Sequence, residues 1–252
     1  LKYGAVVTLV GGVLIGWTGD MDSKIMVKQQ PMKMAAAEGL YKDTTNAPFS
    51  ILTIGDLSGE NATPIIEVPG LLSWLATGDS NAMVEGINDL QKEYEAAPTA
   101  ANAVGSDPNY PETKNTGFGP GWYAPNIPTT YWSFRLMIGL GMIAVLWALC
   151  VLWTTRKGAM PKGKWFLRAA ILMPFLPLLG IAFGWIFTEV GRQPWIVFGQ
   201  MKTADAVSSV VTSTEVIITM VLFTALYGAL AVVEFGLLKR AIKQGPPETV
   251  AY

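Results

Sequence analysis

Long apolar runs limit what this chain can fold into. Residues 131–153, 165–188 and 216–238 each supply about the 20 predominantly apolar residues that a helix needs to cross a membrane. The run at 1–18 is slightly shorter, and we interpret it as a span whose start is truncated. The sequence therefore predicts an all-α integral membrane protein with four transmembrane helices.

Charged residues are scarce in these runs and gather between the first two. Only 15% of the 252 residues are charged, whereas a soluble domain carries roughly 25%. The interval 18–130 contains fourteen acidic and six basic residues. We therefore predict a large loop outside the membrane at 19–130. The net charge of −1 and the lack of a basic tract argue against a nucleic-acid partner.

The basic residues near the span ends predict the orientation of the chain. The link at 154–164 carries Arg156, Lys157, Lys162 and Lys164 and no acid, and the tail at 239–252 begins with basic residues. Basic links of this kind favour the cytoplasmic side. We therefore place the link and the tail in the cytoplasm, and the loops at 19–130 and 189–215 outside it.

The large loop is expected to contain ordered structure. The stretch from Pro31 to Tyr41 is rich in helix-forming residues, and the segment 64–95 has apolar residues at helical spacing (Ile87, Leu90 and Tyr94). The segment 98–128 is rich in Pro, Gly, Asn and Thr, which is typical of irregular chain.

The residue types present exclude several kinds of site. The chain contains no histidine, so these residues alone build no histidine-based metal site or catalytic triad. A single cysteine, Cys150, excludes a disulfide within the chain.

Polar residues within spans are costly and need a reason. Arg168 and Glu234 lie near inner span ends, where interfacial contacts or ion pairs explain them. Glu189 and Arg192, three residues apart, suit a helix-end ion pair. Met137 follows Arg135 closely in the outer part of its span. A methionine there is usually a packing residue, although a thioether is also a soft axial ligand for haem iron.

Three motifs carry a resemblance to a known family. The run Gly-Trp-Ile-Phe-Thr-Glu-Val-Gly-Arg-Gln-Pro-Trp at 184–195 resembles the signature of subunit I of cytochrome bd-type quinol oxidases. The run Gln-Pro-Met-Lys-Met-Ala-Ala-Ala-Glu at 30–38 resembles the start of that family's quinol-binding loop. The run Phe-Arg-Leu-Met at 134–137 resembles the helix start that supplies a haem ligand. The resemblance covers the chain as the C-terminal half of the subunit, in its short outer-loop form.

The resemblance implies a role for each matching residue in haem binding. Met137 would ligate the iron of a low-spin haem b, with Arg135 beside that haem. Glu189 would ligate the iron of a high-spin haem b, with Trp185 and Arg192 close to it. A third haem, haem d or a further haem b, would complete the oxygen site.

The resemblance also implies the overall activity. Quinol would be oxidised at the outer face with the help of Lys33 and Glu38, and O₂ would be reduced to water, which builds membrane potential without a proton pump. The implied partners are the N-terminal half of the subunit with its histidine ligands, a homologous second subunit and membrane lipid, with room for a single-helix small subunit. The implied location is the bacterial cytoplasmic membrane. The alternative is a non-redox transporter or structural subunit that uses Glu189, Arg192 and Glu234 as a polar pathway.

Overall fold

The computed structural model describes residues 1–54, 63–96, 118, 121–158, 163–208 and 210–245. The chain forms two compact units, Leu1–Ala206 and Val207–Tyr252. Within the described ranges, four helical stretches are long and apolar enough to cross a membrane, in agreement with the prediction of four such helices. They are α1 (Lys2–Gln29), α5 (Ile127–Thr155), the pair α6 (Lys164–Leu172) and α7 (Phe175–Gly191), and α8 (Ser213–Gln244).

The first helix continues beyond the apolar run at 1–18 to Gln29. Its extension mixes charged and apolar residues and carries an ion pair between Lys24 and Asp20, one turn apart. The helix stops before Pro31, because a proline disfavours the helical conformation at the residue before it. Pro31 then occupies the first turn of α2 (Pro31–Glu38), which ends at Gly39 in the left-handed conformation.

The third predicted span is interrupted by proline. Helix α6 ends at Leu172 and α7 begins at Phe175, with Pro174 between them. Proline has no amide hydrogen, so it cannot continue the hydrogen-bond ladder of α6. The two helices together still form one stretch long enough to cross a membrane.

The segment between α2 and α5 contains strands as well as helices, so the chain is mostly helical and the all-α prediction is incomplete. Strand β2 (Phe49–Ile54) pairs with β3 (Thr63–Val68), and β1 (Thr44–Thr45) pairs with β4 (Met83–Val84), both antiparallel. Helices α3 (Leu71–Thr77) and α4 (Ile87–Ala96) lie in the same segment, and Ile87, Leu90 and Tyr94 of α4 are buried as their spacing predicts. Most of the predicted irregular stretch at 98–128 lies outside the described residues.

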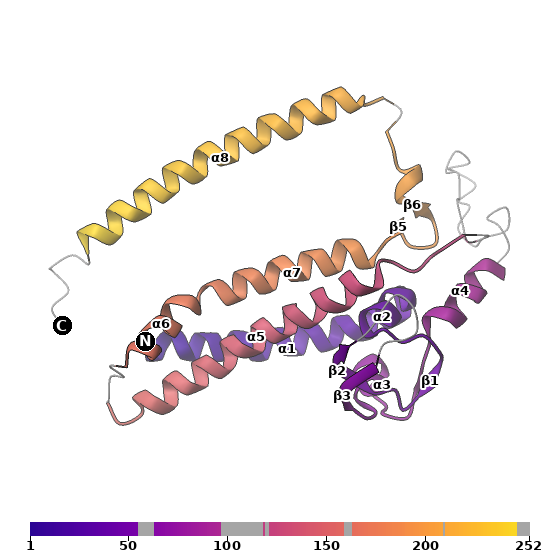
Figure 1. Cartoon of the computed structure of the whole chain (residues 1–252), viewed down its shortest axis with the longest axis horizontal. Coiled ribbons are helices and arrows are strands. Elements are labelled where there is room, and N and C mark those ends of the chain that lie inside the picture. Colours follow the sequence, from indigo (N-terminus) through magenta and orange to yellow (C-terminus); the bar gives the residue numbers. More distant parts are fainter. Residues whose placement is uncertain (55–62, 97–117, 119–120, 159–162, 209, 246–252) are drawn as a thin grey trace. The chain divides into compact units, whose positions relative to one another are not determined.

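Helix α5 is the centre of the first unit. It contacts α1, α2 and α7, and Figure 1 shows α1, α5 and α7 side by side. A buried apolar cluster joins the beginning of α5 to α2, to α4 and to the hairpin of β5 (Trp195–Val197) and β6 (Met201–Lys202); it includes Met32, Ile87, Tyr123, Tyr131 and Trp195. A short 3₁₀ turn (Thr203–Asp205) follows the hairpin. This cluster fixes α2 against the ends of α5 and α7, where most of the candidate site residues lie.

The second unit consists of α8 among the described residues. The hydroxyl of Thr212 accepts a hydrogen bond from the amide of Glu215, and the carboxylate of Glu215 accepts one from the amide of Thr212. This reciprocal capping explains why the helix begins at Ser213.

Candidate functional site

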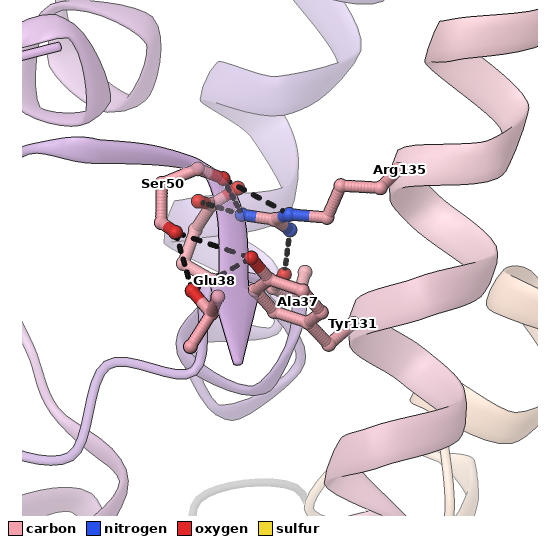
Figure 2. Close-up of polar contacts among 6 residues, drawn as sticks. Ala37, Glu38, Ser50, Tyr131 and Arg135 are labelled. Carbon is pink, nitrogen blue, oxygen red and sulfur yellow. Dashed lines mark hydrogen bonds and ion pairs between the residues drawn. The ribbon is translucent and has the colours of Figure 1, made fainter. Parts of the chain in front are cut away.

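Glu38 and Arg135 form a buried ion pair between α2 and α5. Glu38 is the last residue of α2, and Arg135 lies near the start of α5. Nη2 of Arg135 donates to Oε2 of Glu38 at 2.7 Å, and the two side chains are 8% and 1% exposed. Figure 2 shows the guanidinium reaching from its helix to the carboxylate. The sequence assigned these residues to different tasks, and the structure brings them together.

Arg135 also holds the backbone of the loop. Its Nε and Nη2 donate to the carbonyl oxygen of Ser50 at 3.1 and 2.7 Å, and its Nη1 donates to the carbonyl oxygen of Ala37 (Figure 2). A planar guanidinium can serve several acceptors in this way. The end of α2 and strand β2 are therefore both fastened to α5 by one side chain.

The two oxygens of the Glu38 carboxylate have different surroundings. Burial raises the pKa of Glu38, and the nearby charge and hydrogen bond of Arg135 oppose that rise. Oε2 is bound by Arg135, whereas Oε1 is buried without a hydrogen-bond partner among the described residues. A buried carboxylate with one free oxygen is suited to accept a hydrogen bond or a proton from a ligand.

Three buried hydroxyl groups lie beside this ion pair. The Tyr131 hydroxyl donates to Oγ1 of Thr53 at 2.8 Å and lies 3.1 Å from Oγ of Ser50. Ser50 and Thr53 also bond to each other at 2.5 Å. The ring of Tyr131 stacks under Arg135, with the guanidinium carbon 3.7 Å from the ring centroid. Sequence reasoning missed all three residues, because a single hydroxyl-bearing side chain carries no signal of its own, either in a short strand (Ser50 and Thr53) or near the start of a helix (Tyr131).

Lys33 lies against the end of α7, away from Glu38. Its Nζ is 4.8 Å from the centroid of the Phe187 ring, and its Cε lies 3.2 Å from the position of a Cβ atom built on Gly191. Burial and the charge of Arg192 lower the pKa of Lys33, whereas Glu189 raises it. The five-residue separation from Glu38 places the two side chains about 140° apart on a helix. The structure agrees: Glu38 contacts α5 and Lys33 contacts α7.

The end of α7 carries the predicted ion pair. Nη2 of Arg192 donates to Oε2 of Glu189 at 2.5 Å, and both side chains are partly exposed. Trp185 precedes Glu189 by four residues and is 64% exposed, so both lie on one exposed face of α7. The opposite face carries Phe187, whose ring contacts Phe134 of α5. The helix-end ion pair considered from the sequence is therefore present.

Two buried donors near this ion pair have no partner among the described residues. They are Nε of Arg192 and Nε1 of Trp195. With Lys33, these residues line a cavity of about 10 Å³, which is the size of a single water molecule. The end of α7 therefore offers hydrogen-bond donors to an acceptor that is not part of these residues.

Met137 is half-buried between α5 and α7. A Cβ atom built on Gly184 would lie 3.1 Å from its sulfur, and one built on Gly180 would lie 3.6 Å from its carbonyl oxygen. The sequence analysis did not single out these glycines, although their small-xxx-small spacing is a known signal of close helix packing in membranes.

The residues present fit haem groups better than a bare metal ion. Among the described residues there is no group of three or more His, Cys, Asp or Glu side chains that could hold a metal ion. Met137 and Glu189 each offer a single ligand atom of a type that iron accepts. A macrocycle supplies four ligands itself, so one protein ligand on a side is sufficient. The exposed face with Trp185 and Glu189, and the unpaired donor of Arg192, suit a flat group with acidic substituents.

Comparison with known proteins gives consistent matches along the chain. Residues 1–246 match the family model for cytochrome bd terminal oxidase subunit I. The cytochrome bd ubiquinol oxidase subunit 1 of Bacillus subtilis is 36% identical over 97% of this chain and 48% of its own length. The bd-II ubiquinol oxidase subunit 1 of Escherichia coli is 25% identical over 90% of this chain and 51% of its own length.

A solved structure has a similar fold. The bd oxidase from Geobacillus thermodenitrificans matches with a TM-score of 0.71 and 27% identity. The match covers 98% of this chain and 49% of the matched chain of the Geobacillus oxidase. The chain thus spans about half the length of the relatives that it matches.

Proposed function

The chain belongs to the cytochrome bd terminal oxidase subunit I family, and we propose that it supplies part of a membrane enzyme that oxidises quinol and reduces O₂ to water. The buried Glu38–Arg135 pair with its free carboxylate oxygen is the observation that supports this most directly. Oxidation of a quinol requires a group that accepts a proton from its hydroxyl, and Glu38 has that chemistry. The family match does not favour the non-redox alternative.

Glu38 and Lys33 act at different points of the quinol site. Glu38 accepts the hydroxyl proton at Oε1, while Arg135 stabilises the carboxylate through Oε2. Lys33 is half-buried, and its lowered pKa favours the neutral amine, which can accept the proton of the second hydroxyl group. This division of roles follows from the separate neighbours of the two side chains.

Met137 and Glu189 would hold the haems. Met137 would offer its thioether to a low-spin haem b, and Arg135, two residues earlier on the same helix, would lie beside that haem. Glu189 would offer its carboxylate to a high-spin haem b, and Trp185 and Arg192 would form part of its surroundings. When bound, the haems supply electron transfer and oxygen chemistry; the third, at the oxygen site, is haem d or a further haem b.

The remaining parts of the enzyme come from outside these 252 residues. They are the N-terminal half of the subunit with its histidine ligands, and a homologous second subunit, with room for a single-helix small subunit. The loop at 19–130 and the turn at 189–215 face outward from the bacterial cytoplasmic membrane, and the segments 154–164 and 239–252 face the cytoplasm. Protons released outside and taken up inside would build membrane potential without a pump.

Quinol oxidation and oxygen reduction can be measured separately in the complete oxidase. Glu38→Gln and Lys33→Met should lower oxygen consumption with duroquinol and leave consumption with tetramethylphenylenediamine intact, because this one-electron donor does not need the quinol site. Glu93→Gln and Lys92→Met on α4 are the matched controls. Parallel loss of both activities would contradict the assignment and indicate a role in folding instead.

A further inference from the structure

Tyr131 contacts Arg135 through its ring and strand β2 through its hydroxyl. It lies four residues before Arg135 on α5, so the two side chains share one face of the helix. The Tyr131 side chain is fully buried, and its ring lies 3.7 Å from the guanidinium carbon. Its hydroxyl donates to Oγ1 of Thr53 and lies 3.1 Å from Oγ of Ser50, both on β2. Figure 2 shows the Tyr131 side chain and Ser50. The ring of Phe49, on β2, also lies near the arginine at 5.2 Å from the guanidinium carbon, but the Tyr131 ring is closer and adds the hydroxyl contacts.

The stacked ring restricts the orientation of the guanidinium. The five N–H groups of arginine lie in one plane, so a ring packed on its face leaves the donors free only in the plane. Those in-plane donors reach Glu38 and the carbonyl oxygens of Ala37 and Ser50. The Tyr131 hydroxyl holds the strand that provides the Ser50 carbonyl. One side chain thus sets the plane of the arginine and the position of its acceptor.

The orientation of Arg135 decides which oxygen of Glu38 remains available. Nη2 of Arg135 binds Oε2, and Oε1 stays buried without a partner in the described part of the chain. If the guanidinium turned about its long axis, it could bridge both oxygens and occupy an acceptor site of Oε1 that now faces no partner. The stacking of Tyr131 on Arg135 and the contact of its hydroxyl with β2 favour the arrangement in which Arg135 binds Oε2 alone.

We propose that Tyr131 is a positioning residue, which holds Arg135 on Oε2 of Glu38 and thereby presents Oε1 to a hydroxyl group of the substrate. This inference rests on the proposed role of Glu38 in quinol oxidation. Tyr131 itself does not touch the substrate. Ser50 and Thr53 act with it by anchoring its hydroxyl.

The ring and the hydroxyl can be tested separately in the complete oxidase with duroquinol. Tyr131→Phe keeps the stacked ring and loses the hydroxyl contacts, so KM should rise about fivefold, the effect of one hydrogen bond, with little change in kcat. Tyr131→Leu also loses the stacking, and KM should rise further, by about tenfold or more. Thr53→Val removes a partner of the hydroxyl and should resemble Tyr131→Phe. Tyr227→Phe, which removes an exposed hydroxyl on α8, is the matched control.

Activity with tetramethylphenylenediamine and the haem spectra distinguish positioning from a purely structural role. We expect both to be unchanged in Tyr131→Phe and Thr53→Val. Unchanged KM in these two variants would overturn the proposal, as would a parallel loss of haem content and of both activities. If the oxidase with Tyr131→Leu fails to assemble, Tyr131→Phe and Thr53→Val still test the proposal. If Glu38→Gln shows wild-type kinetics with duroquinol, the proposed function itself is rejected. If Glu38→Gln is impaired while the Tyr131 variants have normal kinetics, only the positioning role of Tyr131 is rejected.

Discussion

The sulfur of Met137 lies 3.1 Å from the point that a Cβ atom on Gly184 would occupy. A methyl group at this position of α7 would therefore press on the side chain that we propose as an iron ligand. The absence of a side chain at Gly184 lets α5 and α7 approach closely at this level. The packing of two spans and the position of a proposed ligand are thus linked by one glycine.

Gly184→Ala is expected to displace the Met137 side chain. Overpacking of this kind costs about 1–3 kcal/mol, and a flexible methionine relieves it by moving its sulfur. The low-spin haem b band in the reduced-minus-oxidised spectrum should shift or weaken. Gly139→Ala on α5 is the control, because nothing lies within 4 Å of a Cβ atom there. Identical spectra for both variants would show that the Met137–Gly184 contact does not matter for the haem.

Met137→Leu is expected to abolish the low-spin haem b spectrum while the protein still inserts in the membrane. Leucine conserves most of the volume, so packing against α7 should be retained, but it has no sulfur to bind iron. Met142→Leu, at an exposed position on the same helix, is the matched control. An unchanged low-spin band in Met137→Leu would end the assignment of this residue as a ligand.

Glu189→Ala is expected to lose the high-spin haem b, and with it the oxygen-site haem, but to retain the low-spin haem b. A carboxylate is a weak-field ligand, which suits a high-spin iron. Haem content by pyridine haemochrome analysis and absorption spectra measure the outcome. Glu234→Ala on α8 is the control. Full occupancy of all haems in Glu189→Ala would mean that Glu189 serves only as the partner of Arg192.

The pH dependence of quinol oxidation should respond to Arg135. Burial raises the pKa of Glu38, and Arg135, on α5, is the charged group that opposes the rise. Arg135→Gln removes the opposing charge, so the pKa of Glu38 rises further and a smaller fraction is ionised at a given pH. The acid limb of kcat/KM for duroquinol should therefore move to higher pH.

Two further variants test whether Glu38 produces the acid limb of kcat/KM for duroquinol. Arg135→Lys keeps the charge and should leave the limb closer to that of the unmodified enzyme. Glu38→Gln removes the titrating group and should remove the limb from the residual activity. An acid limb at the same pH in Arg135→Gln would show that Glu38 is not the group that titrates.

Local patterns were sufficient to predict the spans and part of the loop. Hydropathy located four helices, and the spacing of Ile87, Leu90 and Tyr94 predicted the buried face of α4. The continuation of α1 to Gln29 was missed, because its charged residues give this end the hydropathy of a loop. The hairpin of β2 and β3 was missed as well, because strands of six residues carry little periodic signal.

The sequence by itself determined the four candidate spans, the family and a first set of candidate site residues, because hydropathy and motifs are properties of neighbouring residues. Only the tertiary structure decided how those residues meet. Glu38 and Arg135 are 97 positions apart, and Tyr131 and Thr53 are 78 apart, so neither contact can be inferred from spacing along the chain. The burial of Glu38 and the separate surroundings of Lys33 likewise arise only when α2 packs between α5 and α7. Desolvation and hydrogen-bond geometry depend on that packing, and they determine what the carboxylate can do.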